Sequence, residues 1–267
     1  MASEAPNQGL PALYKGLEPI SKEQHGDKKV TGINGPAVMA QVHAVPVTVE
    51  EFPLLQRHYP VVFSAGENPV PLALMGLHEG VNAFVNDKGE LDDEFLYVPA
   101  YIRRYPFMLA RLTKDAEELS LCFDPTAGAI GDEGQPLFDD DGNPSDATKR
   151  VLQFCEQFEM GAQRTAAFMR ELADMDLLMD GEVSIQPEGL DQPFIYRGFK
   201  MVDEKKFSEL SGDKLRKMNQ NGMLPAIVAH LMSLGQIREV FSRQMKVGKG
   251  PKELAEAMKK AKVETDA

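Results

Sequence analysis

Apolar side chains recur at every third or fourth position from Ala147 to about Met179, and this is the longest regular pattern in the chain. The spacing places them on one face of an α-helix. A single helix over the whole stretch would be long for a globular domain, so we expect Gly161 to mark a break between two helices. Asn143 or Ser145 is in place to cap the first of them.

The first half of the chain has a different pattern, because short β-leaning runs alternate with turn residues. Thr48 and the two glutamates after Val49 predict the N-terminus of a short helix at 49–57. The letters NDKG at 86–89 are typical of a tight turn. The simplest interpretation is a meander of antiparallel strands, with strands expected at 42–47, 60–64, 72–77, 81–85, 119–123 and 136–138.

Helical signals dominate the second half of the chain. Asp203 can cap one helix, Gly222 can end another, and an apolar stripe predicts a further helix at 224–245. Strand-like patches lie at 183–186 and 193–199. We therefore expect an α+β fold, in which a mostly antiparallel N-terminal sheet packs with a helical C-terminal half.

Three parts are expected along the chain: an N-terminal arm at 1–40, a single domain at 41–245 and a basic tail at 246–267. In the arm, Ser21 can cap a short helical turn, with Gln24 three residues on. From Arg238 to the end there are eight Lys or Arg against five Asp or Glu, although the whole chain has a formal charge of -12.

Composition excludes several classes of protein. The chain is 43% apolar and 26% charged, which is typical of a globular protein. Its acidic balance repels nucleic acid, so we expect no nucleic-acid partner. Cys122 and Cys155 are interpreted as reduced, buried thiols, and the N-terminal segment MASEAPNQGLPALYKG is not expected to be a secretory signal. The apolar run MLPAIVAHLMSLGQI is too short and polar to span a membrane. We expect a cytoplasmic protein, which leaves signal-independent export open.

Sequence motifs for catalysis, metal or cofactor binding are weak. There is no G-x-S-x-G, and Ser233 with His230 is interpreted as part of an apolar helix. The stretch FDDDGNPSDAT resembles a calcium loop, but Leu137 falls at the first ligand position and Thr148 where a glutamate is needed. A solvated turn before a helix fits it better. The five histidines have no metal-ligand spacing, so we expect no metal and no cofactor.

The stretch YVPAYIRRYPFMLARL at 97–112 is the densest unusual segment. Tyrosines at spacing four predict one helical face, and Pro106 predicts a kink or a new helix start. We expect this helix to be pinned on the sheet. Two interpretations of Arg103 and Arg104 stay open. One is that a guanidinium is tied to a buried acid, and the other is that it faces a ligand or partner.

Six segments occur here in the order found in the SapC-like family of bacterial proteins: FPLLQRHYPVVFS, LALMGLHEGVNAFVNDKGEL, YVPAYIRRYPF, LCFDPTAG, PLFDDDGNPSDAT and GMLPAIVAHLMSLGQI. The chain resembles that family from about Leu10 to Arg243. The family is named for a protein associated with a surface layer and has no established catalytic residues, cofactor or substrate. Its members tend to be encoded near outer-membrane receptors and flavin-dependent halogenase-like proteins, which implies an accessory role. The unrelated peptide-transporter permease of the same name would need membrane spans.

The leading hypothesis is a non-enzymatic accessory or binding protein that holds a protein segment or a small anionic ligand. Six residues are the candidates for that binding: Arg103, Arg104, Tyr101, Tyr105, His58 and Asp124. One alternative is an enzyme whose site near Arg104 uses His58, Tyr105 or Asp124, beside a 2-oxoglutarate or flavin partner. Another alternative is a structural protein of a surface layer.

Overall fold

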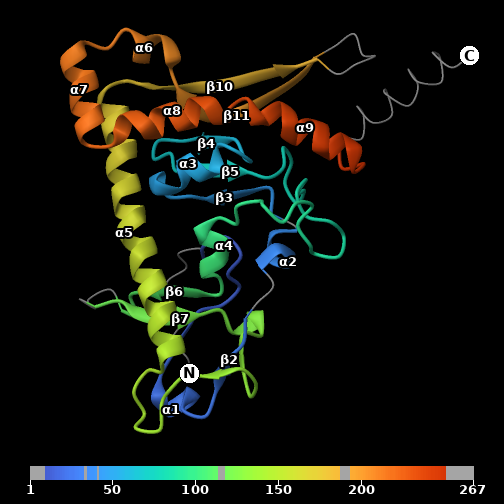
Figure 1. The fold of residues 1–267 in the computed structure, drawn as a ribbon, viewed down its shortest axis with the longest axis vertical. Helices are drawn as coiled ribbons and strands as arrows, with labels where there is room; N and C mark the ends of the chain where they lie inside the picture. The colour runs from blue at the N-terminus through green and yellow to red at the C-terminus, as the bar shows by residue number, and fades with distance from the viewer. Residues whose placement is uncertain (1–9, 33–34, 41, 114–117, 187–192, 251–267) are drawn as a thin grey trace, which may run out of the picture. The chain divides into compact units, whose positions relative to one another are not determined.

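A computed structural model describes residues 10–32, 35–40, 42–113, 118–186 and 193–250. Helices and antiparallel sheets occur together, which confirms the expected α+β class (Figure 1). The chain divides into two compact units. Unit 1 comprises Met1–Gly35 and Arg103–Glu159, and unit 2 comprises Pro36–Ile102 and Met160–Ala267.

Unit 1 contains two small antiparallel sheets and the first part of the long helix α5. One sheet has the order β1-β7-β6 and the other the order β8-β2-β9. The core of this unit contains Phe107, Leu109, Phe123 and Cys155, and Val151 and Leu152 of α5 pack against it. The elements of unit 1 are β1 (Glu18–Pro19), α1 (Lys22–His25), β2 (Lys29–Val30), β6 (Phe107–Ala110), β7 (Ser120–Phe123), η2 (Pro125–Ala127), β8 (Ile130–Gly131), β9 (Gln135–Pro136) and the start of α5 (Asp146–Asp174).

The described part of the N-terminal segment is built into unit 1. It supplies β1 and β2, and the Tyr14 hydroxyl donates to the Phe107 carbonyl oxygen at 2.8 Å. The helical turn expected after Ser21 is confirmed as α1, where the Ser21 hydroxyl accepts from the Gln24 N–H at 3.4 Å. Residues 10–32 therefore contribute strands and core contacts to this unit.

Unit 2 is built on a five-stranded antiparallel sheet of order β10-β11-β4-β5-β3. The hairpin β10–β11 comes from the second half of the chain and pairs with β4 from the first half, and helix α8 packs against β4 and β11 (Figure 1). The elements of unit 2 are α2 (Gly35–Met39), β3 (Ala44–Pro46), η1 (Val49–Glu51), α3 (Phe52–Leu55), β4 (Val61–Ser64), β5 (Pro71–Leu74), β10 (Leu178–Ile185), β11 (Phe194–Val202), α6 (Glu204–Ser208), α7 (Gly212–Gln220), α8 (Met223–Ser233) and α9 (Gln236–Lys246).

The helix break expected at Gly161 is wrong, because α5 runs without interruption from Asp146 to Asp174 (Figure 1). Gly161 has a different reason to lack a side chain. A Cβ at this position would lie 3.1 Å from Thr48 Cγ2, tighter than ordinary van der Waals contact. The glycine therefore allows η1 and its cap to approach α5 closely, and the helix continues through it.

Three other boundaries differ from expectation. The helix expected at 224–245 is two helices, α8 and α9, which meet around Leu234 and Gly235. The run at 81–85 forms only an isolated bridge from Val85 to Leu91. The short helix after Thr48 is present as a 3-10 turn followed by α3.

The expectation of a kinked helix or a new helix start at Pro106, within 97–112, is also wrong. Only Ala100–Arg104 is helical, as α4, and a cis Tyr105–Pro106 bond then leads into strand β6. Pro106 has no N–H to continue the helix, and alternate residues of the next segment, Phe107 and Leu109, are buried. The three tyrosines of the motif therefore do not share one helical face.

Candidate anion-binding groove

Arg104 and Arg103 have different surroundings in unit 1. The Arg104 side chain is only 4% exposed, and its Nη1 lies 3.1 Å from Glu159 Oε1. Its guanidinium also lies over the ring of Phe158, 4.1 Å from the centroid. A buried guanidinium that has both a carboxylate and an aromatic face as neighbours serves to hold α4 against α5.

Arg103, one residue earlier, is exposed. Its guanidinium lies over the ring of Phe154, 5.3 Å from the centroid, and its side chain lines a groove of about 610 Å³. Four segments of the chain line this groove, which we call the Arg103 groove. They contribute Val30, Thr31 and Gly32; Arg103, Tyr105, Pro106 and Phe107; Gly134 and Gln135; and Ala147, Arg150 and Val151 of α5.

The Arg103 groove has a positive wall. Arg103 and Arg150 both line it, and no Asp or Glu is among its lining residues within the described chain. Arg150 precedes Phe154 by four residues on α5, so the two share a helix face. Arg103 lies over the ring of Phe154, so both arginines are associated with this face of α5. Arg150 Nη2 donates to Gln135 Oε1 at 3.0 Å, which orients it.

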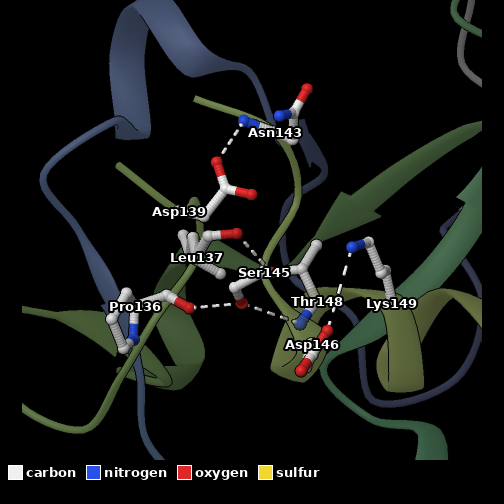
Figure 2. Close-up of polar contacts among 8 residues, drawn as sticks. All are labelled: Pro136, Leu137, Asp139, Asn143, Ser145, Asp146, Thr148 and Lys149. Carbon is white, nitrogen blue, oxygen red and sulfur yellow. Dashed lines mark hydrogen bonds and ion pairs between the residues drawn. The ribbon is translucent and has the colours of Figure 1, made fainter. Parts of the chain in front are cut away.

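The first turn of α5, which precedes Arg150, is tied to β9 by hydrogen bonds (Figure 2). The Ser145 hydroxyl donates to the Pro136 carbonyl oxygen at 2.6 Å and accepts from the Thr148 N–H at 3.3 Å. The Thr148 hydroxyl donates to the Leu137 carbonyl oxygen at 2.7 Å. Ser145 therefore caps α5 while it anchors the helix to the neighbouring strand.

In the loop that resembles a calcium site, the Asp139 carboxylate accepts hydrogen bonds from backbone N–H groups of the loop itself. Asp139 Oδ1 accepts from the Asn143 N–H at 2.8 Å and from the Asp141 N–H at 3.1 Å (Figure 2 shows the first of these). Leu137, at the position of the first ligand, is buried. The exposed acids of the loop form the solvated turn before a helix that the sequence predicts.

Tyr105 and Asp124, two of the candidate residues, contact one another in unit 1. The Tyr105 hydroxyl donates to Asp124 Oδ2 at 3.3 Å, and the Lys15 N–H donates to the same oxygen at 2.7 Å. Thr126 donates to Oδ1 through its N–H and its hydroxyl. Burial of Asp124 opposes its ionisation, but these hydrogen bonds outweigh that effect and hold its pKa below the ordinary value.

The same contact affects Tyr105. Burial, followed by the charge of Asp124 and the hydrogen bond to it, raises the Tyr105 pKa. The pair is therefore a neutral Tyr105 phenol that donates to an ionised Asp124 carboxylate, and protein groups supply the hydrogen bonds to that carboxylate. It fixes Tyr105 at the Arg103 groove and starts η2, and the Asp124 oxygens are already engaged as acceptors.

The remaining candidates, Tyr101 and His58, belong to unit 2. Tyr101 is buried, and His58 is half-buried. Burial and then the positive charges of Arg57 and Arg243 lower the His58 pKa below its ordinary value. Unit 1 thus contains four of the six candidates, Arg103, Arg104, Tyr105 and Asp124, and of these Arg103 and Tyr105 line the groove.

Sequence patterns did not single out Arg150 and Gln135. The available signal was weak: Arg150 stands four residues before Phe154 in the apolar stripe, which places a cation beside an aromatic ring on a helix face. Nothing in the sequence shows that this helix face lies beside Arg103.

His230 and Ser233 are packing residues of α8, as the sequence suggests. His230 Nδ1 lies 2.8 Å from the Val61 carbonyl oxygen, and Nε2 accepts from the Val202 N–H at 3.1 Å. The Ser233 hydroxyl donates to the His230 carbonyl oxygen at 2.6 Å instead of to the ring. Both ring nitrogens are thus used to join β4 and β11.

A family model described as SapC matches residues 20–240 of the chain. No curated protein and no solved structure matches it. Across the ranges described by the structure, no helix is long and apolar enough to cross a membrane. Within the same ranges, no group of three or more His, Cys, Asp or Glu side chains is placed to hold a metal ion.

Proposed function

The chain belongs to the SapC family, and from this premise we propose that it is a non-enzymatic accessory protein that binds an anionic ligand or partner in the Arg103 groove. One observation carries the proposal. Arg103 and Arg150 both line a groove of about 610 Å³ that has no carboxylate among its described lining residues. Guanidinium groups make forked, charge-assisted hydrogen bonds to carboxylates and phosphates.

The negative charge of the rest of the molecule favours anion binding in the groove over anion binding elsewhere on the surface. The chain carries a formal charge of -12, so an anion is repelled over most of the surface. An anion that reaches the groove meets two cations together. The attraction acts at short range and is screened by salt.

Binding is better supported than catalysis. Asp124 accepts four hydrogen bonds from Lys15, Thr126 and Tyr105, so its oxygens are occupied by the fold. His58, the other candidate base, is not among the described residues that line the groove. The groove itself contributes fixed cations and apolar side chains, which suit recognition.

The proposal is tested with a double variant, Arg103→Ala with Arg150→Ala. Two-dimensional NMR of the labelled protein follows the amides of Tyr105, Gln135 and Val151 during titration with acetate, inorganic phosphate and a tetraglutamate peptide. We expect saturable shifts for at least one anion in the natural protein and a loss of binding of at least tenfold in the double variant.

A matched control removes two exposed arginines elsewhere, Arg111→Ala with Arg197→Ala, and so changes the net charge equally. This control should bind like the natural protein. Equal binding by the groove variant, or no saturable shift with any of the three anions, would contradict the proposal. Circular dichroism confirms that both double variants remain folded.

The proposal includes a cytoplasmic location. Its support is the pair of reduced cysteines, Cys122 and Cys155, which are both buried. Burial raises their pKa values, to about 11 for Cys122 and about 12 for Cys155, so both are unreactive thiols at neutral pH. Fractionation of native cells tests this location, and recovery of the protein only with the cell envelope would favour a surface-layer role instead.

A further inference from the structure

We propose that the ligand of the Arg103 groove is an amphipathic carboxylate, a small molecule with one carboxylate and an apolar body. This inference rests on the proposed function and specifies its ligand class. The guanidinium groups of Arg103 and Arg150 would hold the carboxylate, and the apolar walls of the groove would hold the body.

The apolar walls are continuous with the core of unit 1. Phe107 is a member of that core, and Val30 and Val151 pack against it. All three also line the groove, together with Pro106 and Ala147. A hydrocarbon body in the groove would therefore extend the existing core and remove both surfaces from water.

Each of the two arginines that line the groove has a neighbour that orients its guanidinium group. The Phe154 ring supports the Arg103 guanidinium, and Gln135 orients Arg150. Fixed guanidinium forks match the two oxygens of a carboxylate. A few positioned polar groups in a mostly apolar pocket are typical of small-ligand sites, and a volume of about 610 Å³ falls in their usual range.

An extended peptide fits this groove less well. Two strands contribute to the lining of the groove, β2 through Val30 and β9 through Gln135. In the order β8-β2-β9, β2 is central and already paired on both sides, and β9 is an edge strand. Its second residue is Pro136, which has no N–H to donate to an added strand. Strand addition is the usual way in which a sheet edge binds a peptide, so this edge favours a ligand without a backbone to pair.

The test is an alkanoate series, acetate, butanoate, hexanoate and octanoate, titrated by calorimetry or NMR. Burial of each methylene is expected to tighten binding by about fourfold until the groove is filled. Hexanol, which has the same apolar body without the charge, should bind at least tenfold more weakly than hexanoate. In Arg103→Ala with Arg150→Ala, hexanoate should bind no better than hexanol.

Two further variants separate the contribution of the ligand's carboxylate from that of its apolar body. Val151→Thr keeps the shape of the side chain and replaces one methyl group with a hydroxyl, so it should weaken the binding of hexanoate by about three- to tenfold and leave the binding of acetate unchanged. Arg103→Lys with Arg150→Lys keeps both charges and loses the forks, so it should bind hexanoate with intermediate affinity. Thermal melts establish that each variant is folded.

The outcomes distinguish this inference from the proposed function. If acetate and hexanoate bind equally, or if only phosphate or tetraglutamate shifts the groove amides, the amphipathic class is wrong and anion binding stands. If hexanoate binds the double alanine variant as tightly as the natural protein, the arginines have no role and both proposals are overturned.

Discussion

Arg104 carries its charge inside unit 1, where Glu159 and the ring of Phe158 contact its guanidinium. Arg103 carries the same charge on an exposed side chain at the rim of a groove. Burial of an ion is costly unless it is paired, and an exposed ion has no such requirement. The two neighbours therefore differ in what their loss would cost the fold.

Arg104→Ala should destabilise the protein by about 2–4 kcal/mol, because it removes a buried pair and leaves Glu159 without its partner. Arg103→Ala should cost less than about 1 kcal/mol, the usual effect of a surface change with a modest cation–π contact. Urea unfolding measures both. Equal losses in the two variants would show that Arg103 is as much a part of the fold as Arg104.

Asp124 should contribute to acid sensitivity. Its pKa is lowered in the folded state, so the unfolded state binds the proton more readily. Its contribution is present above the ordinary carboxyl pKa of about 4 and is lost as the pH falls through the lower folded value. Asp124→Asn should lower stability at pH 7 by about 1–3 kcal/mol and flatten the decline below pH 4, measured by urea unfolding across pH.

At the scale of elements, the pairing of β4 with β11 depends partly on a side chain. The described register pairs Phe199 with Ser64 and Lys200 with Phe63. Beyond these pairs, the His230 ring joins the Val61 carbonyl oxygen to the Val202 N–H, and Phe63 stacks on the ring at 4.5 Å. A neutral imidazole from α8 thus extends the contact between two strands.

Protonation of His230 would remove the acceptor for the Val202 N–H. Burial lowers the His230 pKa to about 4, and the hydrogen bond to Val61 opposes this only in part. Because the folded pKa lies below the ordinary value of about 6.5, the unfolded state binds more protons between these limits. Stability should therefore fall by about 3 kcal/mol as the pH drops from 6.5 to 4. In His230→Gln this dependence should disappear, and persistence of the full decline would assign it to other groups.

The continuity of α5 has its own test. Met160 lies within α5 and is 48% exposed. It immediately precedes Gly161, where a helix break was expected. Met160→Pro should cost about 3 kcal/mol or more, because proline removes a helical hydrogen bond and clashes with the preceding turn. Met160→Ala should change stability by less than about 0.5 kcal/mol. Tolerance of the proline in urea unfolding would indicate a natural break at this position.

At the scale of the whole molecule, an acidic chain contains a local positive site. The formal charge of -12 keeps the surface repulsive toward anions and nucleic acid, while Arg103 and Arg150 provide the attraction within unit 1. We infer that the acidic balance limits nonspecific anion binding. Each compact unit has its own sheets, and the proposed site lies wholly in residues of unit 1.

Local features were determined by the sequence alone. Ser21 and Asp203 cap α1 and α6 as their side chains predict. The strands β4 and β7 lie within the segments expected from the residue pattern, and β5 overlaps the segment expected at 72–77. These features depend on interactions between residues a few positions apart, which are present in any sequence window. The family could also be predicted, since its segments are contiguous.

Only the tertiary structure decided which arginine is internal and which side chain completes the site. Arg103 and Arg104 have the same chemistry and adjacent positions, and their difference comes from the part of α5 that each contacts. Arg150 and Gln135 join the groove across long sequence separations. Such contacts follow from how sheets and helices pack, and side-chain patterns along one segment carry no information about the partner segment. For the same reason, the closeness of Thr48 to Gly161 turned a predicted helix break into a continuous helix.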